Sequence, residues 1–168
     1  MSKNWMPLAG VAALAFAALT TTNIANAANK QSILARMYLW SNATMLKPEG
    51  YTEAGYAQYY TPDAVLIIDG VEVVRGLPAF VKHFDRIKAS GAKVQTSIPF
   101  ETEFRSGNFI HTRHYVRSSR GGETACMLAV GHAELRKGKI AVLSLVRTRV
   151  DHKSPDFADK CRWEDRTN

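Results

Sequence analysis

The sequence predicts an α+β domain, and three features of its order carry that prediction. Helical periodicity comes first, over residues 30–46. A hairpin and a further helix follow over residues 64–90, and long β-rich segments with short turns between them fill residues 93–150. Helices that precede an antiparallel meander, instead of alternating with its strands, are typical of the α+β class.

The two N-terminal helices are expected from apolar spacing and from their end signals. Over residues 30–46, apolar side chains recur at three- and four-residue steps. The Lys-Pro-Glu-Gly segment at 47–50 then breaks the helix. Thr52 is a typical N-cap for a short second helix that runs through Tyr60. Pro62 ends that helix, because the residue before a proline is displaced from the helical region.

The rest of the domain is expected to be a hairpin, a third helix and a meander. Two β-rich runs flank Asp69-Gly70, which is the strongest short hairpin signal. An apolar stripe predicts a helix over residues 76–90, and Gly91 ends it. Asp69 is explained by the turn itself. The remaining strands, joined by glycine-containing turns, are expected at 93–104, 109–118, 124–136 and 139–150.

The ends of the chain differ in composition from the domain. Residues 1–27 have one early lysine, an apolar run over 8–19 and a small-residue ending, Ala-Asn-Ala, which together indicate a secretory signal peptide. The apolar run is too short to span a bilayer, which takes about 20 residues. We therefore expect a periplasmic or secreted protein with no membrane span, a domain over 28–151 and a polar C-terminal tail over 152–168.

The net charge of +7 favours anionic partners without establishing them. The basic residues are scattered over predicted strands instead of forming runs, so we predict a solvated basic surface and no nucleic-acid partner. Cys126 and Cys161 are the only cysteines, and they form either a disulfide or two separate thiols. Neither cysteine has other metal-ligating residues at the spacing of a metal site, and the sequence contains no phosphate-binding loop. We therefore predict neither a metal site nor a cofactor.

One combination of motifs resembles a known superfamily. Tyr59–Leu66, which reads Tyr-Tyr-Thr-Pro-Asp-Ala-Val-Leu, is followed by Arg75-Gly76 and then by Gly138-Lys139-Ile140. In this order they resemble the SnoaL-like branch of the nuclear transport factor 2-like superfamily, over about residues 33–150. The resemblance implies a cone-shaped, strongly bent antiparallel sheet that packs on the N-terminal helices and encloses an apolar pocket. Members use such a pocket for isomerases, dehydratases, cyclases and binding modules.

The candidate site follows from strand alternation and from this resemblance. On the strand after Phe109, one face interleaves aromatic and ionisable groups, which suits the wall of a mixed pocket. A bent sheet would bring His111 or Arg113 of this face towards His132. The resemblance implies acid–base roles for His111, His132 and Tyr56. The candidate ligand-binding residues are Tyr60, Arg113, Tyr115 and Trp40.

Alternatives stay open for these residues. A structural or surface role for His111 and His132 competes with a catalytic one. His83 is expected to be exposed, and His114 is expected on the outer face of the sheet. No acidic residue is assigned to the pocket, so a carboxylate base is in doubt.

Two functions remain open on the sequence. The first is a cofactor-free isomerase or lyase, such as a dehydratase or cyclase, that moves protons on a small organic molecule. The second is a non-catalytic module that binds a small hydrophobic or anionic ligand, or a protein. The last strand is apolar on both faces, so we also expect something to cover the outer face, most simply a second copy in a homodimer.

Overall fold

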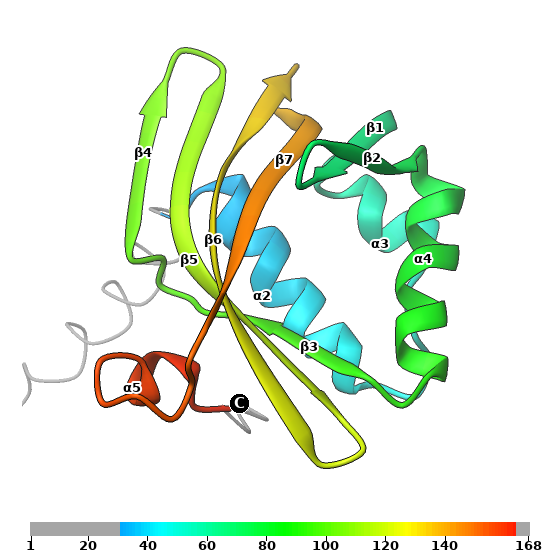
Figure 1. Cartoon of the computed structure of the whole chain (residues 1–168). Helices are drawn as coiled ribbons and strands as arrows, with labels where there is room; N and C mark the ends of the chain where they lie inside the picture. The colour runs from blue at the N-terminus through cyan, green and yellow to red at the C-terminus, as the bar shows by residue number, and fades with distance from the viewer. Residues whose placement is uncertain (1–30, 164–168) are drawn as a thin grey trace, which may run out of the picture. The chain divides into compact units, whose positions relative to one another are not determined.

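The computed structural model describes residues 31–163 of the chain, which fall almost entirely within one compact unit, residues 32–168 (Figure 1). The predicted signal peptide, residues 1–27, lies outside the described residues. Within residues 31–163, no helix is long and apolar enough to cross a membrane.

The helices come first and a meander of strands follows, as the sequence predicts for the α+β class. The elements are, in chain order, α2 (Ile33–Leu46), α3 (Glu53–Ala57), β1 (Tyr60–Ile68), β2 (Val71–Arg75), α4 (Leu77–Ala89), β3 (Lys93–Thr96), β4 (Thr102–Ser106), β5 (Phe109–Arg120), β6 (Glu123–Arg136), β7 (Lys139–Val150) and α5 (Ala158–Cys161).

Side-chain caps fix the starts of the first two helices. The Ser32 hydroxyl accepts a hydrogen bond from the Ala35 N–H at 3.0 Å, which sets the start of α2. The Thr52 hydroxyl accepts from the Gly55 N–H at 3.1 Å, as predicted for α3. Tyr60 was expected to end α3 but is the first residue of β1. The backbone before Pro62 is extended, and Tyr60 pairs with Ile140 of β7.

The strands form one strongly curled sheet with the order β2-β1-β7-β6-β5-β3, and β4 pairs with β5. Every pair is antiparallel except β1 with β7, which run parallel. The prediction of a purely antiparallel sheet is wrong in this one pairing, because β1 and β7 are distant in sequence and meet only in the tertiary structure. In Figure 1, α2, α3 and α4 lie on the concave side of the sheet and α5 lies on the other side. The predicted cone is confirmed.

The strand predicted over residues 93–104 is two strands. Residues 97–101 separate β3 from β4 and contain Pro99, which has no N–H to give to a ladder. β3 pairs with the Val116–Ser119 part of β5, whereas β4 pairs with the Phe109–Arg113 part. Between them, Ser97 and Tyr115 exchange two hydrogen bonds of 2.9 Å.

The predicted Asp69-Gly70 turn is present, with positive φ values of 54° and 83° that match the turn favoured by a two-residue hairpin. The Asp69 carboxylate also accepts hydrogen bonds from the backbone N–H and the Nη2 of Arg147, both at 2.8 Å. Asp69 therefore fastens the hairpin to β7, in addition to making the turn.

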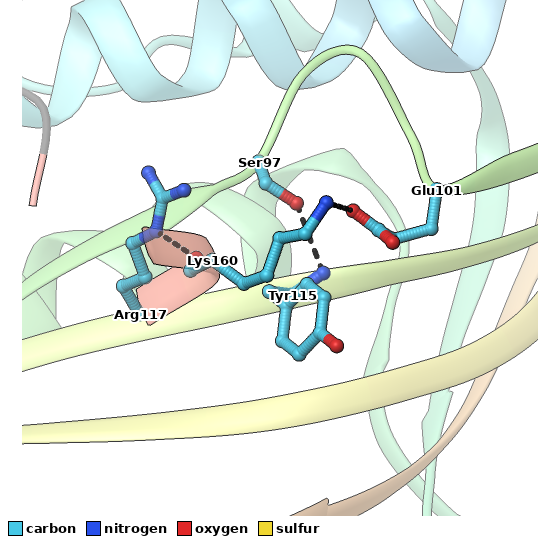
Figure 2. Close-up of polar contacts among 5 residues, drawn as sticks. All are labelled: Ser97, Glu101, Tyr115, Arg117 and Lys160. Atoms are coloured by element: carbon cyan, nitrogen blue, oxygen red, sulfur yellow. Dashed lines mark hydrogen bonds and ion pairs between the residues drawn. The ribbon is translucent and has the colours of Figure 1, made fainter. Parts of the chain in front are cut away.

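The C-terminal tail is attached to the outer face of the sheet. A disulfide joins Cys126 of β6 to Cys161 of α5, which decides between the two alternatives left open by the sequence. Arg117 Nε donates a 2.9 Å hydrogen bond to the Lys160 carbonyl, and Lys160 Nζ lies 2.8 Å from a Glu101 carboxylate oxygen (Figure 2). The tail is thus linked covalently and by polar contacts to β5, β6 and the segment before β4.

Candidate functional site

A cavity of about 170 Å³ lies between the concave face of the sheet and the helices α2 and α4. Its walls are mostly apolar, with Met37 and Met45 from α2, Phe80 and Phe84 from α4, and Leu143 from β7. A few polar side chains interrupt this apolar surface. Such a composition is typical of small-molecule sites, where a few polar groups orient a ligand in an apolar pocket.

Two of the predicted site residues, Tyr56 and Tyr60, lie on the cavity wall. Tyr56 is only 1% exposed, and its hydroxyl has no hydrogen-bond partner within the described chain. The Tyr60 hydroxyl contacts the sulfur of Met37 at 3.6 Å. Burial raises the pKa of both phenols far above the ordinary value of a tyrosine. Both side chains therefore stay neutral, and each can donate a hydrogen bond to a ligand but does not serve as a phenolate base.

Trp40, another predicted ligand-binding residue, is not on the cavity wall. Its ring packs edge-on against Tyr56, with ring centroids 4.9 Å apart, and against Tyr51 at 5.8 Å. Trp40 therefore supports the Tyr56 ring from behind.

The structure reverses the expected faces of β5. The face with Ile110, Thr112, His114 and Val116 is buried beneath the helices. The face that begins at Phe109 is the outer one. Both faces of this strand mix polar and apolar residues, so alternation alone could not decide which of them is buried.

As a result, the other four predicted site residues lie outside the cavity. His111 and His132 face each other across β5 and β6, with ring centroids 5.8 Å apart, so the expected approach of these histidines is confirmed. They meet on the outer face, next to the exposed Arg113. Tyr115 is also on that face, beneath Phe157 of the tail. Pocket roles for these four side chains have no geometric support.

Two ionisable residues that were not predicted in the pocket, His83 and Arg147, also line it. His83, expected to be exposed, is half-buried on the wall, where burial first and Arg86 second lower its pKa. It follows Phe80 by three residues and precedes Ile87 by four, so the apolar stripe of α4 could have placed it. Arg147 is two residues beyond Leu145 on the inner face of β7, and the same alternation could have placed it.

His114 is fully buried on the inner face, not on the outer face as predicted. Its ring packs between those of Tyr38 and Phe100, at centroid distances of 5.4 and 5.3 Å. Neither ring nitrogen has a hydrogen-bond partner in the described part of the chain. Burial lowers the pKa of His114 to about 4, so the ring is neutral at pH 7.

Among residues 31–163, no group of three or more His, Cys, Asp or Glu side chains is arranged to hold a metal ion. No acidic side chain is found on the cavity wall either. The ionisable groups on the wall are therefore tyrosine hydroxyls, one histidine and one arginine, and neutral polar side chains accompany them: Ser41, Asn42, Thr96 and Ser118.

No protein-family model matches the chain, and no curated protein matches it either. Its structure is similar to solved ones. An LEH-like epoxide hydrolase from M. tuberculosis superposes with a TM-score of 0.55 at 13% identity, covering 69% of this chain and 81% of that one. An NTF2-like protein of unknown function from Exiguobacterium sp. 255-15 gives 0.54 at 16% identity, covering 71% and 99%.

A hypothetical protein with a ketosteroid isomerase-like fold from Catenulispora acidiphila, solved with trimethylamine, gives a TM-score of 0.52 at 10% identity. It covers 70% of this chain and 86% of that one. At such identities the likeness concerns the fold. The described chain has the fold of the nuclear transport factor 2-like superfamily, as the resemblance in its sequence predicts.

Proposed function

We propose that this protein binds a small, mostly apolar molecule that carries one anionic or hydrogen-bond-accepting group. The observation that supports this most directly is the apolar cavity of about 170 Å³ with Arg147 on its wall. A dry cavity of roughly 150 Å³ is large enough for benzene. The ligand class is therefore a molecule of about one ring with a polar substituent.

Arg147 is the group that would orient the ligand. Its Nη2 is paired with Asp69 at 2.8 Å, which holds the guanidinium in place. Its side chain as a whole is 29% exposed, which leaves part of the guanidinium accessible. A hydrogen bond from this charged group to an oxygen of the ligand would contribute about 1.5–3 kcal/mol.

Benzoate is a suitable probe, because it combines one ring with a carboxylate. We expect Arg147→Gln to weaken benzoate binding by about tenfold or more, since a hydrogen bond to a charged group contributes about 1.5–3 kcal/mol. Isothermal titration calorimetry would measure the change. Arg75→Gln is the matched control, because it breaks the Arg75–Glu72 ion pair outside the cavity. Equal weakening in both variants, or none in either, would contradict the assignment.

A second candidate function is cofactor-free proton transfer on the bound molecule, in the isomerase or lyase class. Two wall residues favour it. Tyr56 keeps a neutral hydroxyl without a partner in the described chain, and the lowered pKa of His83 leaves its imidazole free to accept a proton at pH 7. His111 and His132 are not assigned to this chemistry, because they lie on the other face.

Mass spectrometry of molecules retained by the purified protein would identify the compound on which to test turnover. Under the catalytic function, Tyr56→Phe slows conversion of that compound while the compound still binds. A compound that binds and leaves chemically unchanged would instead support the binding function alone.

Export and self-association also belong to this proposal. The composition of residues 1–27 supports secretion, and a mature chain that begins at Ala28 in the periplasm or medium would agree with it.

Exposed Val130 and Val146 on the outer face, at 52% and 65% exposure, support a homodimer. Sedimentation velocity of the purified protein would distinguish the dimer from a monomer.

A further inference from the structure

His111 and His132 form a pair that the pocket does not use. They are direct cross-strand partners in the register of β5 and β6, and both side chains lie on the outer face of the sheet. Their ring centroids are 5.8 Å apart, and the ring planes are inclined by 48°. Both side chains are half-buried, so solvent still reaches the pair.

Two phenylalanines hold these rings in position. Phe104 of β4 stacks on His111, with centroids 4.8 Å apart and planes within 12°. Phe109 lies edge-on against His132 at 5.6 Å. Phe104 remains 57% exposed and Phe109 38% exposed, so the rings flank the histidines without covering them. The imidazoles are thus oriented by aromatic packing, which leaves their nitrogens available to another ligand.

The spacing fits a shared metal ion. An ion bound 2.0–2.1 Å from a nitrogen of each imidazole places the two ring centroids roughly 4.5–6.4 Å apart, depending on the N–metal–N angle, and the observed separation lies within that range. Neutral imidazole is the protein ligand that suits zinc, copper and nickel. We propose that His111 and His132 chelate one divalent transition-metal ion on the outer face of the sheet, with Cu²⁺ bound most tightly.

The order of affinity follows from the donor set. Since no third His, Cys, Asp or Glu joins the pair within the described residues, water completes the coordination sphere. Copper(II) binds a given set of nitrogen and oxygen donors more tightly than nickel(II) or zinc(II) does. A site with only two protein ligands therefore discriminates in favour of Cu²⁺.

The charges around the pair nearly balance. Arg113 lies two residues from His111 on the same face of β5, and Glu134 lies two residues from His132 on the same face of β6. Facing the pair from β4 and β7 are Phe104 and Ser144, which are uncharged. The repulsion of a cation by Arg113 is thus offset by Glu134, and the imidazoles determine binding.

Cu²⁺ titration of the untagged full chain tests this site. At pH 7.5, in a buffer that does not chelate metals, we expect one Cu²⁺ per chain and an electron paramagnetic resonance spectrum with two coordinated imidazole nitrogens. His111→Gln and His132→Gln should each weaken this binding by about tenfold or more, since each removes one of the two ligands. His83→Gln, in the cavity, and His152→Gln, near Thr124, are the matched controls and should bind as the wild type does.

A second measurement needs no variant. Diethyl pyrocarbonate modifies accessible imidazoles, and mass spectrometry locates the modified histidines. Bound Cu²⁺ should protect His111 and His132 and leave His152 unprotected. Equal protection of all three histidines, a one-nitrogen spectrum, or unchanged affinity in both glutamine variants would overturn the proposal. Since the pair and the cavity lie on opposite faces, benzoate binding should be the same with and without Cu²⁺, which keeps this test separate from that of the proposed function.

Discussion

His114 is a residue whose burial should make the stability of the domain depend on pH below neutrality. Its pKa is about 4 in the folded protein and about 6.5 in an unfolded chain. A lowered folded pKa means that the unfolded state takes up the proton first. Stability is therefore complete above about pH 6.5 and is lost as the pH falls towards 4.

Replacing His114 with leucine should remove this dependence. Between pH 7.5 and pH 5, protonation of His114 in the unfolded state lowers the wild-type free energy of unfolding by about 2 kcal/mol. His114→Leu should lack that loss, and at pH 7.5 it should cost little because it removes two unpaired buried nitrogens. Urea denaturation at both pH values measures the difference. If His114→Leu lost as much stability on acidification as His152→Leu does, the predicted role of His114 would be wrong.

Individual residues were predictable from the sequence where a local pattern determined them. Thr52 caps its helix and Asp69 makes its turn, as short-range rules predict. The positions of His83 and Arg147 were also present in the periodicity of α4 and β7, but their charge obscured it. The faces of β5 could not be predicted, because polar groups occur on both, and which of them is buried depends on where the helices pack.

At the scale of elements, the C-terminal tail gives the clearest prediction. The disulfide joins residues separated by 35 positions, and the closed loop restricts the unfolded chain. Cys161→Ser should lower the free energy of unfolding by about 2–4 kcal/mol. Lys160→Gln, which removes only the exposed ion pair with Glu101, should cost much less than Cys161→Ser.

Urea denaturation of both variants, with and without a reductant, measures these costs. Reductant should destabilise the wild type and the Lys160→Gln variant, and should leave Cys161→Ser unchanged. If reduction of the disulfide were demonstrated and the free energy of unfolding of the wild type did not fall, the tail would not be stabilising.

Element boundaries show why the sheet was only partly predictable. The hairpin, α4 and the last three strands follow from turn residues and periodicity. The division between β3 and β4 had a local signal in Pro99, which the β-rich composition around it concealed. The parallel pairing of β1 with β7 has no local signal at all, because nearly eighty residues separate the partners, for example Leu66 and Leu143.

At the scale of the whole domain, the order of the elements was enough to predict the α+β class, and the motif resemblance predicted the curled sheet around a pocket. The content of the pocket was not predictable to the same degree. Its walls combine α2, α3, α4 and five strands. If the other face of a strand is buried, a different set of polar side chains lines the pocket. Tyr56 and Tyr60 avoided this ambiguity because both were predicted on a helix, where strand alternation plays no part.

The methionines make the central claim directly testable. Met37, Met45 and Met127 all line the cavity, whereas Met1 and Met6 belong to the predicted signal peptide. In full-length protein labelled with ¹³C at the methionine methyls, added benzoate should shift the signals of the three cavity methionines and leave those of Met1 and Met6 in place. Arg147→Gln should require about tenfold more benzoate for the same shifts. Unchanged cavity signals at millimolar benzoate, or equal shifts of all five methyls, would contradict a pocket that binds small molecules.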